Sequence, residues 1–122
     1  MKRVLMSITP EYFEKIANHV KCYEYRKRKC HFPIEAIVFY VRKPIGKIMG
    51  EVSVEEPIEG KPEEVWKLTG EKAGVSREEL LAYCGRADWV YAYPIREVTI
   101  YDTPYMLEDF GRKWPPQSFY YL

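Results

Sequence analysis

The side chains best suited to chemistry lie together at residues 21–29, which read Lys-Cys-Tyr-Glu-Tyr-Arg-Lys-Arg-Lys. One carboxylate, Glu24, stands among five lysines and arginines, so it should stay ionised and can pair with Arg26. Such a cluster can bind a phosphate through its cations while the carboxylate accepts from a base amine or orients a lysine. The alternative is a solvated edge strand whose charges discourage aggregation.

Alternating aromatic residues predict that this segment forms a short strand. Strict alternation would put Lys21 and Glu24 on opposite faces. A bulge, or a strand that begins only at Cys22, would bring both side chains to one face. The two predicted faces consist of Cys22, Glu24 and Arg26 on one side and Lys21, Tyr23, Tyr25 and Lys27 on the other.

Length and composition indicate one globular domain spanning residues 1–122, with 47% hydrophobic and 30% charged residues. No apolar run reaches the eighteen residues or so that a transmembrane helix needs, so no membrane partner is expected. The apolar region near the N-terminus is too short for a signal peptide. We therefore expect a cytoplasmic protein.

Charge is distributed unevenly along the chain. Residues 1–47 carry eleven basic and four acidic side chains, whereas residues 48–122 carry eight and fourteen. The basic part suits a polyanion such as RNA, and the acidic part leaves a protein-interaction module open. A single asparagine and a single glutamine beside abundant Glu and Lys are typical of thermophile proteins.

The three cysteines, Cys22, Cys30 and Cys84, do not form a disulfide framework. His19 and His31 lack the spacing to cysteine that zinc sites show. We therefore expect structural thiols, and neither a metal nor any other cofactor.

The N-terminal half shows clear element boundaries. Residues 4–8 alternate as a buried strand, and Thr9 and Pro10 are suited to the N-cap and first position of a helix in which Tyr12 belongs to the apolar stripe. The apolar run at residues 36–41 and the alternating run at 47–55 predict a hairpin with a turn at residues 43–46.

The C-terminal half mixes helices and strands. Residues 62–68 predict a short helix, and Ser76 with Glu79 forms a capping box before another. Pro94 is expected to divide the next β segment at a bulge or an edge, and the apolar tail should dock. These elements favour a mainly β, α+β fold: a small, mostly antiparallel, curved or barrel-like sheet of five to six strands, with two to three short helices at its rim.

The order of these motifs resembles the ASCH family, and the resemblance covers nearly the whole chain. Its first block, Ser7-Ile8-Thr9-Pro10, a helix and then Lys21-x-x-Glu24-x-Arg26, is followed by the hairpin, the Ser-capped helix and a Pro-Pro-Gln-Ser-Phe ending, as in a stand-alone prokaryotic or archaeal branch. The resemblance implies a β-barrel shared with PUA-like RNA-binding domains, and a cleft that contains both Lys21 and Glu24.

The chain also departs from the family pattern. His19 stands where glycine is usual. An amidohydrolase branch deacylates acetylated cytidine with a lysine, a threonine three residues later and a downstream glutamate. Lys21 matches the lysine, but Glu24 stands at the threonine position and Ala73 near the glutamate position, with Glu71 as the nearest acid. A neighbouring lysine cannot activate a carboxylate as it activates a hydroxyl nucleophile.

These observations favour a module that binds RNA or a modified nucleotide, with cations on the phosphate and tyrosines stacked on the base. Tyr23, Tyr25 and Tyr40 are candidates for the stack, with burial in the core as the alternative for each. Gln117 and Ser118 should lie near the same cleft. The residues predicted to line the ligand site are Lys21, Glu24, Arg26, Lys27, Arg28, Tyr40, Gln117 and Ser118.

The alternative function is an RNA-directed hydrolase, either a nuclease or an amidohydrolase of acylated nucleosides. Lys21 would then be the base or electrophile and Glu24 the general acid–base. In either case we expect the two residues to form a coupled, charged pair that is exposed enough to contribute only about 0–1 kcal/mol to stability.

Overall fold

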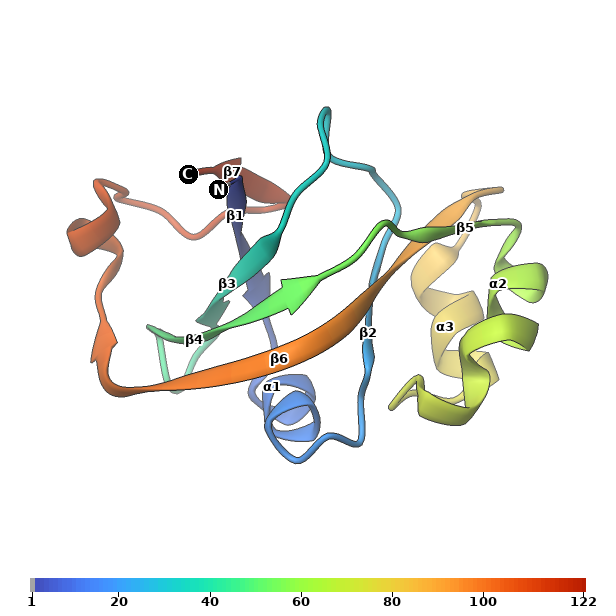
Figure 1. Ribbon diagram of the computed structural model, residues 1–122, viewed down its shortest axis with the longest axis horizontal. Helices are drawn as coiled ribbons and strands as arrows, with labels where there is room; N and C mark the ends of the chain where they lie inside the picture. The colour runs from blue at the N-terminus through green and yellow to red at the C-terminus, as the bar shows by residue number, and fades with distance from the viewer. Residues whose placement is uncertain (1) are drawn as a thin grey trace.

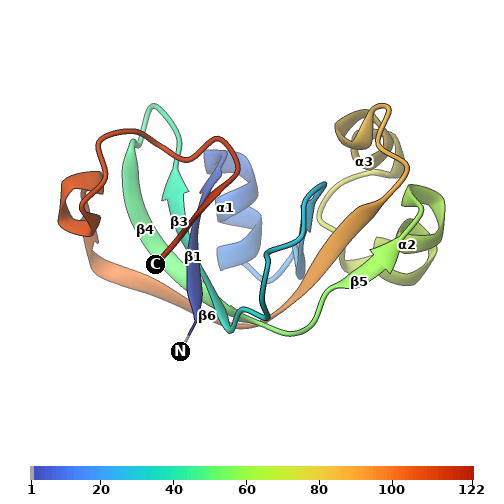
Figure 2. The same ribbon diagram turned by 90° about the horizontal axis from the view of Figure 1, so that it is seen from above.

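The strands of the computed structural model, which describes residues 2–122, form one sheet that curls into a half-barrel (Figures 1 and 2). The α-helix α1 lies inside the curve, whereas α2 and α3 lie together at one end (Figure 2). In chain order the elements are β1 (Arg3–Ile8), α1 (Pro10–Ala17), β2 (Tyr23–Arg26), β3 (Ala36–Val41), β4 (Lys47–Val54), β5 (Ile58–Gly60), α2 (Pro62–Thr69), the 3-10 helix η1 (Gly70–Lys72), α3 (Arg77–Cys84), β6 (Val90–Tyr105), the 3-10 helix η2 (Leu107–Phe110) and β7 (Phe119–Tyr121).

The strand order is β2-β6-β4-β3-β1-β7, and β5 pairs with β6. Only the β1–β3 pair is parallel within this sheet; the other described pairs are antiparallel. The predicted mainly β, mostly antiparallel α+β fold is therefore confirmed. The sheet has seven strands, not five to six, because β5 and β7 have three residues each and are too short to show an alternating pattern.

Helix boundaries follow the predicted caps. The Thr9 hydroxyl accepts from the Tyr12 N–H with Pro10 at the start of α1, and Ser76 and Glu79 form the capping box of α3. His19, which follows α1 at the position where the family pattern has glycine, has φ 60° and so adopts the left-handed conformation as a non-glycine residue. Each α-helix has eight residues, and none within residues 2–122 is long and apolar enough to cross a membrane.

The expected division of the β segment at Pro94 is wrong, because β6 continues through it as one strand of 16 residues. Pro94 lies where β6 exchanges partners: the residues up to it pair with β2, and those from Ile95 onward pair with β4. The next amide, that of Ile95, donates to the Cys22 carbonyl at 2.9 Å. A proline at such an exchange of partners removes no hydrogen bond from either ladder. The expected irregularity near Pro94 is present as a shift in the β4–β6 register between Val52 and Val54.

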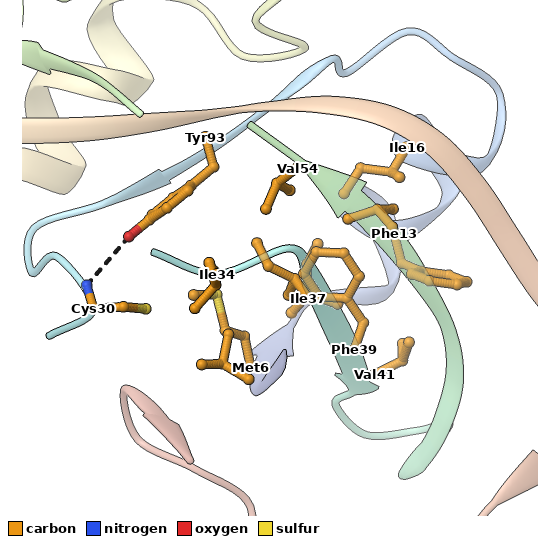
Figure 3. Packing of buried hydrophobic residues seen from close by; sticks show 13 residues of the cluster. Met6, Phe13, Ile16, Cys30, Ile34, Ile37, Phe39, Val41, Val54 and Tyr93 are labelled. Atoms are coloured by element: carbon orange, nitrogen blue, oxygen red, sulfur yellow. Dashed lines mark hydrogen bonds between the residues drawn. The ribbon is translucent and has the colours of Figure 1, made fainter. Parts of the chain in front are cut away.

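The largest core cluster lies between α1 and the sheet (Figure 3). All six residues of β3 are buried, as expected for a central strand. The Tyr93 hydroxyl lies among these apolar side chains and accepts from the Cys30 N–H at 3.2 Å. A second cluster joins α2, α3 and the first part of β6. The two clusters flank β2, which therefore runs along the boundary between the sheet body and the helical end.

Candidate functional site

A cavity of about 220 Å³ opens where the end of β1, the start of α1, β2 and α3 meet. We call it the central cavity. It is lined by Ser7, Ile8, Thr9, Tyr12, Lys21, Glu24, Tyr25, Arg26, Arg42, Val75, Glu79, Leu80 and Tyr83.

Lys21 and Glu24 face each other in this cavity, with Lys21 Nζ 4.0 Å from Glu24 Oε1. The alternation that would separate them does not apply, because β2 begins at Tyr23 and Lys21 precedes it. Their side chains are only 3% and 7% exposed. The expectation that this pair is exposed enough to contribute only about 0–1 kcal/mol is therefore wrong, since removing one member of a buried pair leaves an uncompensated charge.

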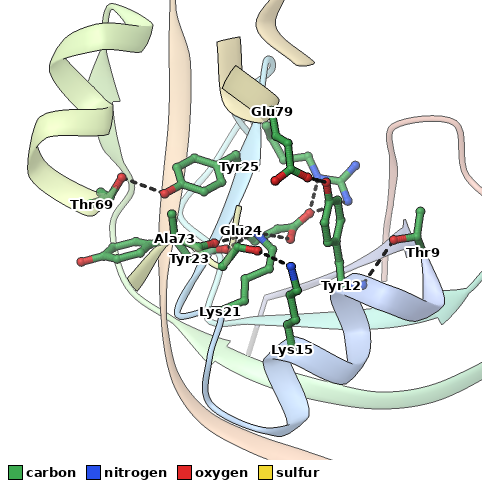
Figure 4. A network of polar contacts seen from close by, with 12 residues as sticks. Thr9, Tyr12, Lys15, Lys21, Tyr23, Glu24, Tyr25, Thr69, Ala73 and Glu79 are labelled. Atoms are coloured by element: carbon green, nitrogen blue, oxygen red, sulfur yellow. Dashed lines mark hydrogen bonds and ion pairs between the residues drawn. The ribbon is translucent and has the colours of Figure 1, made fainter. Parts of the chain in front are cut away.

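The Lys21 ammonium is enclosed by oxygen atoms and aromatic rings (Figure 4). It donates to the Tyr23 carbonyl at 2.7 Å and lies 3.5 Å from the Ala73 carbonyl. It also lies 4.8 Å from the centroid of the Tyr25 ring and 5.5 Å from that of Tyr12. Burial lowers the pKa of Lys21, and the Glu24 carboxylate opposes this effect.

Three consecutive carbonyls hold this segment from the side of η1. The Lys72 carbonyl accepts from the Cys22 N–H at 2.8 Å, Ala73 from Lys21 Nζ, and Gly74 from Lys15 Nζ at 3.0 Å. Gly74 has φ 71°, and a Cβ there would lie 2.4 Å from Lys21 Cβ. The close approach of this loop to Lys21 therefore requires glycine.

Arg26 binds one oxygen of Glu24 and also connects two strands that do not pair. Its Nε and Nη2 lie 3.0 and 2.8 Å from Glu24 Oε2, and Nη2 donates to the Ser7 carbonyl at 2.9 Å. This second bond joins β2 to β1 across the open side of the half-barrel. Among residues 2–122, nothing donates a hydrogen bond to the other oxygen, Glu24 Oε1.

Tyrosine side chains form the walls of the central cavity. The Tyr12 hydroxyl donates to Glu79 Oε2 at 3.3 Å and so links α1 to α3 (Figure 4). The Tyr25 hydroxyl lies 2.8 Å from Thr69 Oγ1, whose own proton goes to the Val65 carbonyl, so Tyr25 is the donor. Burial raises the pKa of Tyr25 to about 12, and both phenols remain neutral hydrogen-bond donors at pH 7.

The predicted site residues separate into those that line the cavity and those that do not. Lys21, Glu24 and Arg26 line it together. Lys27 is exposed at its edge, with Nζ 5.0 Å from the ring centroid of Tyr83. Arg28 is exposed and lies outside the lining.

The other predicted residues lie outside the lining. Tyr40 is buried in a separate cluster with Leu5 and Val38, because β3 has both faces covered. Gln117 is exposed and Ser118 half-buried, and neither lines the cavity. The tail reaches the site through Pro116, whose carbonyl accepts from the Ser7 hydroxyl at 2.8 Å.

Nine of the thirteen lining residues escaped the sequence analysis as candidate site residues, among them Tyr12, Arg42, Glu79 and Tyr83. Arg42 directly follows β3, which runs parallel to β1, so the ends of both strands reach the same edge. Its amide donates to the Ile8 carbonyl at 2.9 Å. The parallel pairing would have been the signal for Arg42, but it is not visible in the sequence.

Comparison with solved structures shows that the chain is similar to ASCH from Zymomonas mobilis, with a TM-score of 0.87, 22% identity, and coverage of 98% of this chain and 87% of that one. A tyrosine-to-phenylalanine mutant of that protein matches with a TM-score of 0.87 and 23% identity, and the match covers 100% of this chain and 91% of the mutant. The N-terminal domain of Staphylothermus marinus McrB matches with a TM-score of 0.53 and 12% identity, and the match covers 88% of this chain and 77% of that domain. No family model and no curated protein matches the chain. The chain therefore has the fold of an ASCH domain.

Proposed function

We propose that the central cavity binds one nucleotide of RNA, or a modified nucleoside, with its base between tyrosine rings and its phosphate on cations at the rim. The ASCH fold supports a module of this kind. The cavity, at about 220 Å³, is smaller than the roughly 300–1,000 Å³ typical of pockets for drug-sized ligands. A volume of this size suits a single base that has left its stack.

The observation that carries the proposal is that Glu24 Oε1 accepts no hydrogen bond from residues 2–122. A carboxylate oxygen that lines a cavity and accepts no hydrogen bond can accept one from a ligand, and the amine or ring N–H of a base is a suitable donor. Lys21 and Arg26 hold the carboxylate in place and compensate its charge, while Tyr12 and Tyr25 offer ring surface beside it.

The cations available for a phosphate are at the rim, since Lys21 and Arg26 already have partners inside. Arg42 lines the cavity, is exposed, and has no side-chain partner within the described chain. Lys27 is exposed beside Tyr83. Both can bind a phosphate without breaking the buried network.

The test is equilibrium binding of single-stranded RNA pools and of free nucleosides, measured across a series of salt concentrations. The logarithm of the affinity for RNA should fall linearly with the logarithm of salt. Arg42→Ala should weaken binding and reduce the salt slope by about one phosphate contact. Lys67→Ala, which removes an exposed cation on α2 away from the cavity, is the matched control and should change neither. Absence of binding to any RNA pool at low salt would contradict the proposal.

Glu24→Gln tests the role of the carboxylate itself. It keeps the shape but adds a donor, so nucleosides should bind at least about tenfold more weakly, while salt-dependent contacts at the rim persist. Unchanged nucleoside affinity in a folded Glu24→Gln protein would show that the base does not contact Glu24.

A hydrolase is the second candidate, favoured by one observation. Burial lowers the pKa of Lys21 beside a carboxylate in a cavity, which is a frequent property of catalytic lysines. Against it, Ala73 carries no carboxylate and Glu71 is exposed outside the lining, so neither supplies the downstream glutamate of the amidohydrolase branch. Glu79 does line the cavity, but its two oxygens already accept from the Ser76 amide and the Tyr12 hydroxyl.

Turnover of acylated cytidine and of RNA separates the two candidates. The native protein should bind without turnover, and Glu24→Thr restores the residue that the amidohydrolase branch uses. Hydrolysis by the native protein that Lys21→Ala abolishes would favour the hydrolase and overturn the preference for binding.

A further inference from the structure

A second cavity is lined mainly by the C-terminal part of β6 and by η2, and it shares no lining residue with the central cavity. We call it the outer cavity; its volume is about 560 Å³, within the range of small-molecule sites. Because it involves neither Lys21 nor Glu24, its role is independent of the nucleotide proposal. It is lined by Arg3, Glu51, Tyr101, Thr103, Pro104, Tyr105, Asp109 and Phe110.

Three aromatic rings meet at right angles in the outer cavity. Tyr101 and Tyr105 have centroids 5.2 Å apart at 85°, and Tyr105 and Phe110 are 5.7 Å apart at 84°. Tyr101, Thr103 and Tyr105 all line the cavity from the part of β6 where its register with β4 shifts, and the small Thr103 between the tyrosines leaves space at the surface. Tyr105 is 45% exposed, so its ring is not needed to fill the core.

Two carboxylates complete this arrangement. Glu51 accepts from the Tyr101 hydroxyl at 2.9 Å, and burial and Glu51 raise the pKa of Tyr101, which keeps this phenol neutral. Asp109 Oδ2 accepts from the Met106 amide and leaves Oδ1 available. One cation, Arg3, lies 3.6 Å from Glu51, so the ionised side chains of the lining still sum to one negative charge.

We infer that the outer cavity binds an organic ammonium group, carried by a methylated lysine side chain or by a small free amine. In these edge-to-face pairs the edge of one ring contacts the face of the other, and the ring faces that stay exposed, as on the 45% exposed Tyr105, attract a cation. Methyl groups on the nitrogen would contact the rings, while the Asp109 carboxylate compensates the charge. A neutral ligand would gain the contacts but not the electrostatic attraction.

The test uses choline and dimethylbutanol, its uncharged isostere, in which a carbon replaces the quaternary nitrogen. Two-dimensional NMR of the full chain at constant ionic strength should show saturable shifts at the amides of Tyr101, Tyr105 and Phe110 with choline. Dimethylbutanol should bind at least about tenfold more weakly. Equal binding of both would identify an apolar groove and overturn the inference, as would the absence of localised shifts with choline.

Variants then assign the binding to the rings. Tyr105→Ala should weaken choline binding about tenfold, whereas Tyr105→Phe, which keeps the ring, should change it no more than about twofold. Trp114→Ala is the control, because Trp114 is a 67% exposed aromatic outside the lining. If Tyr105→Ala folds and still binds choline normally, the inference is wrong. If a trimethyllysine peptide binds more tightly than choline, the ligand is the side chain of a protein partner. If the peptide binds equally or more weakly, the ligand is a small free amine.

Discussion

The central cavity and the outer cavity differ in how their charged side chains are held. In the central cavity, Lys21 and Glu24 are almost completely buried and are held by backbone carbonyls and a guanidinium. In the outer cavity, Arg3 and Glu51 remain 34% and 26% exposed, and three aromatic rings line the wall beside them. Buried charges couple a site to the stability of the fold, whereas a partly exposed aromatic site can change with little effect on it. This contrast can be tested.

The largest effect should come from Glu24→Ala. It leaves Lys21 and Arg26 buried without their counter-ion, so the free energy of unfolding should fall by about 3–5 kcal/mol in urea denaturation. Glu59→Ala breaks a half-exposed pair with Lys29 and should cost at most about 1 kcal/mol. Equal losses in the two variants would remove the distinction between buried and exposed charge.

Gly74→Ala should have the next largest effect. The substitution strains a residue at φ 71° and pushes a methyl against Lys21, at a combined cost of about 2–4 kcal/mol. Gly111→Ala is a matched control, because Gly111 has φ 70° but no neighbouring atom within 4 Å of the added Cβ. Its cost should be only about 1–2 kcal/mol. The difference between the two measures how tightly the loop packs on Lys21.

Tyr25→Phe should make the free energy of unfolding less dependent on pH above pH 10, because it removes the buried phenol of the central cavity. The pKa of Tyr25 is raised from 10.0 to about 12 in the folded state, so its contribution to stability is complete below pH 10. Above pH 10 the unfolded state loses the proton first, and this contribution is lost progressively up to about pH 12. The stability of the native protein relative to Tyr25→Phe should therefore fall by about 2 kcal/mol as the pH rises to about 11.5. A difference independent of pH would contradict the burial of this phenol.

The smallest effect on stability should come from Tyr105→Ala in the outer cavity. Loss of two edge contacts at a surface that is already 45% exposed should cost about 1 kcal/mol or less. The same urea experiment measures it. A loss as large as that of Glu24→Ala would show that the outer cavity is part of the structural core.

Local signals predicted much of the fold. The caps at Thr9 and Ser76 and the β3–β4 hairpin follow from short sequence patterns and are confirmed. The continuity of β6 could not be predicted, because Pro94 is accommodated by an exchange of partner strands that depends on tertiary structure. Tyr40 was placed wrongly because a run of apolar residues buried on both faces does not show which face a side chain occupies.

The site was predictable only where its residues are neighbours in sequence. Lys21, Glu24 and Arg26 come from one segment, so their charges and spacing were visible. Tyr12 and Glu79 already had local roles, in an apolar stripe and a capping box, and only the curvature of the sheet brings α1 and α3 together. No spacing rule connects two helices that meet in this way.

The pairing of β1 with β7 has a consequence for synthesis of the chain. β1 leaves the ribosome early, but its partner residues Phe119–Tyr121 follow only after almost all of the remaining sequence. At translation rates of roughly 5–20 residues per second, the outer edge of β1 stays open for several seconds. During that time a nascent chain exposes an apolar strand that can pair with another chain, so crowded polysomes are where this protein is most vulnerable to aggregation.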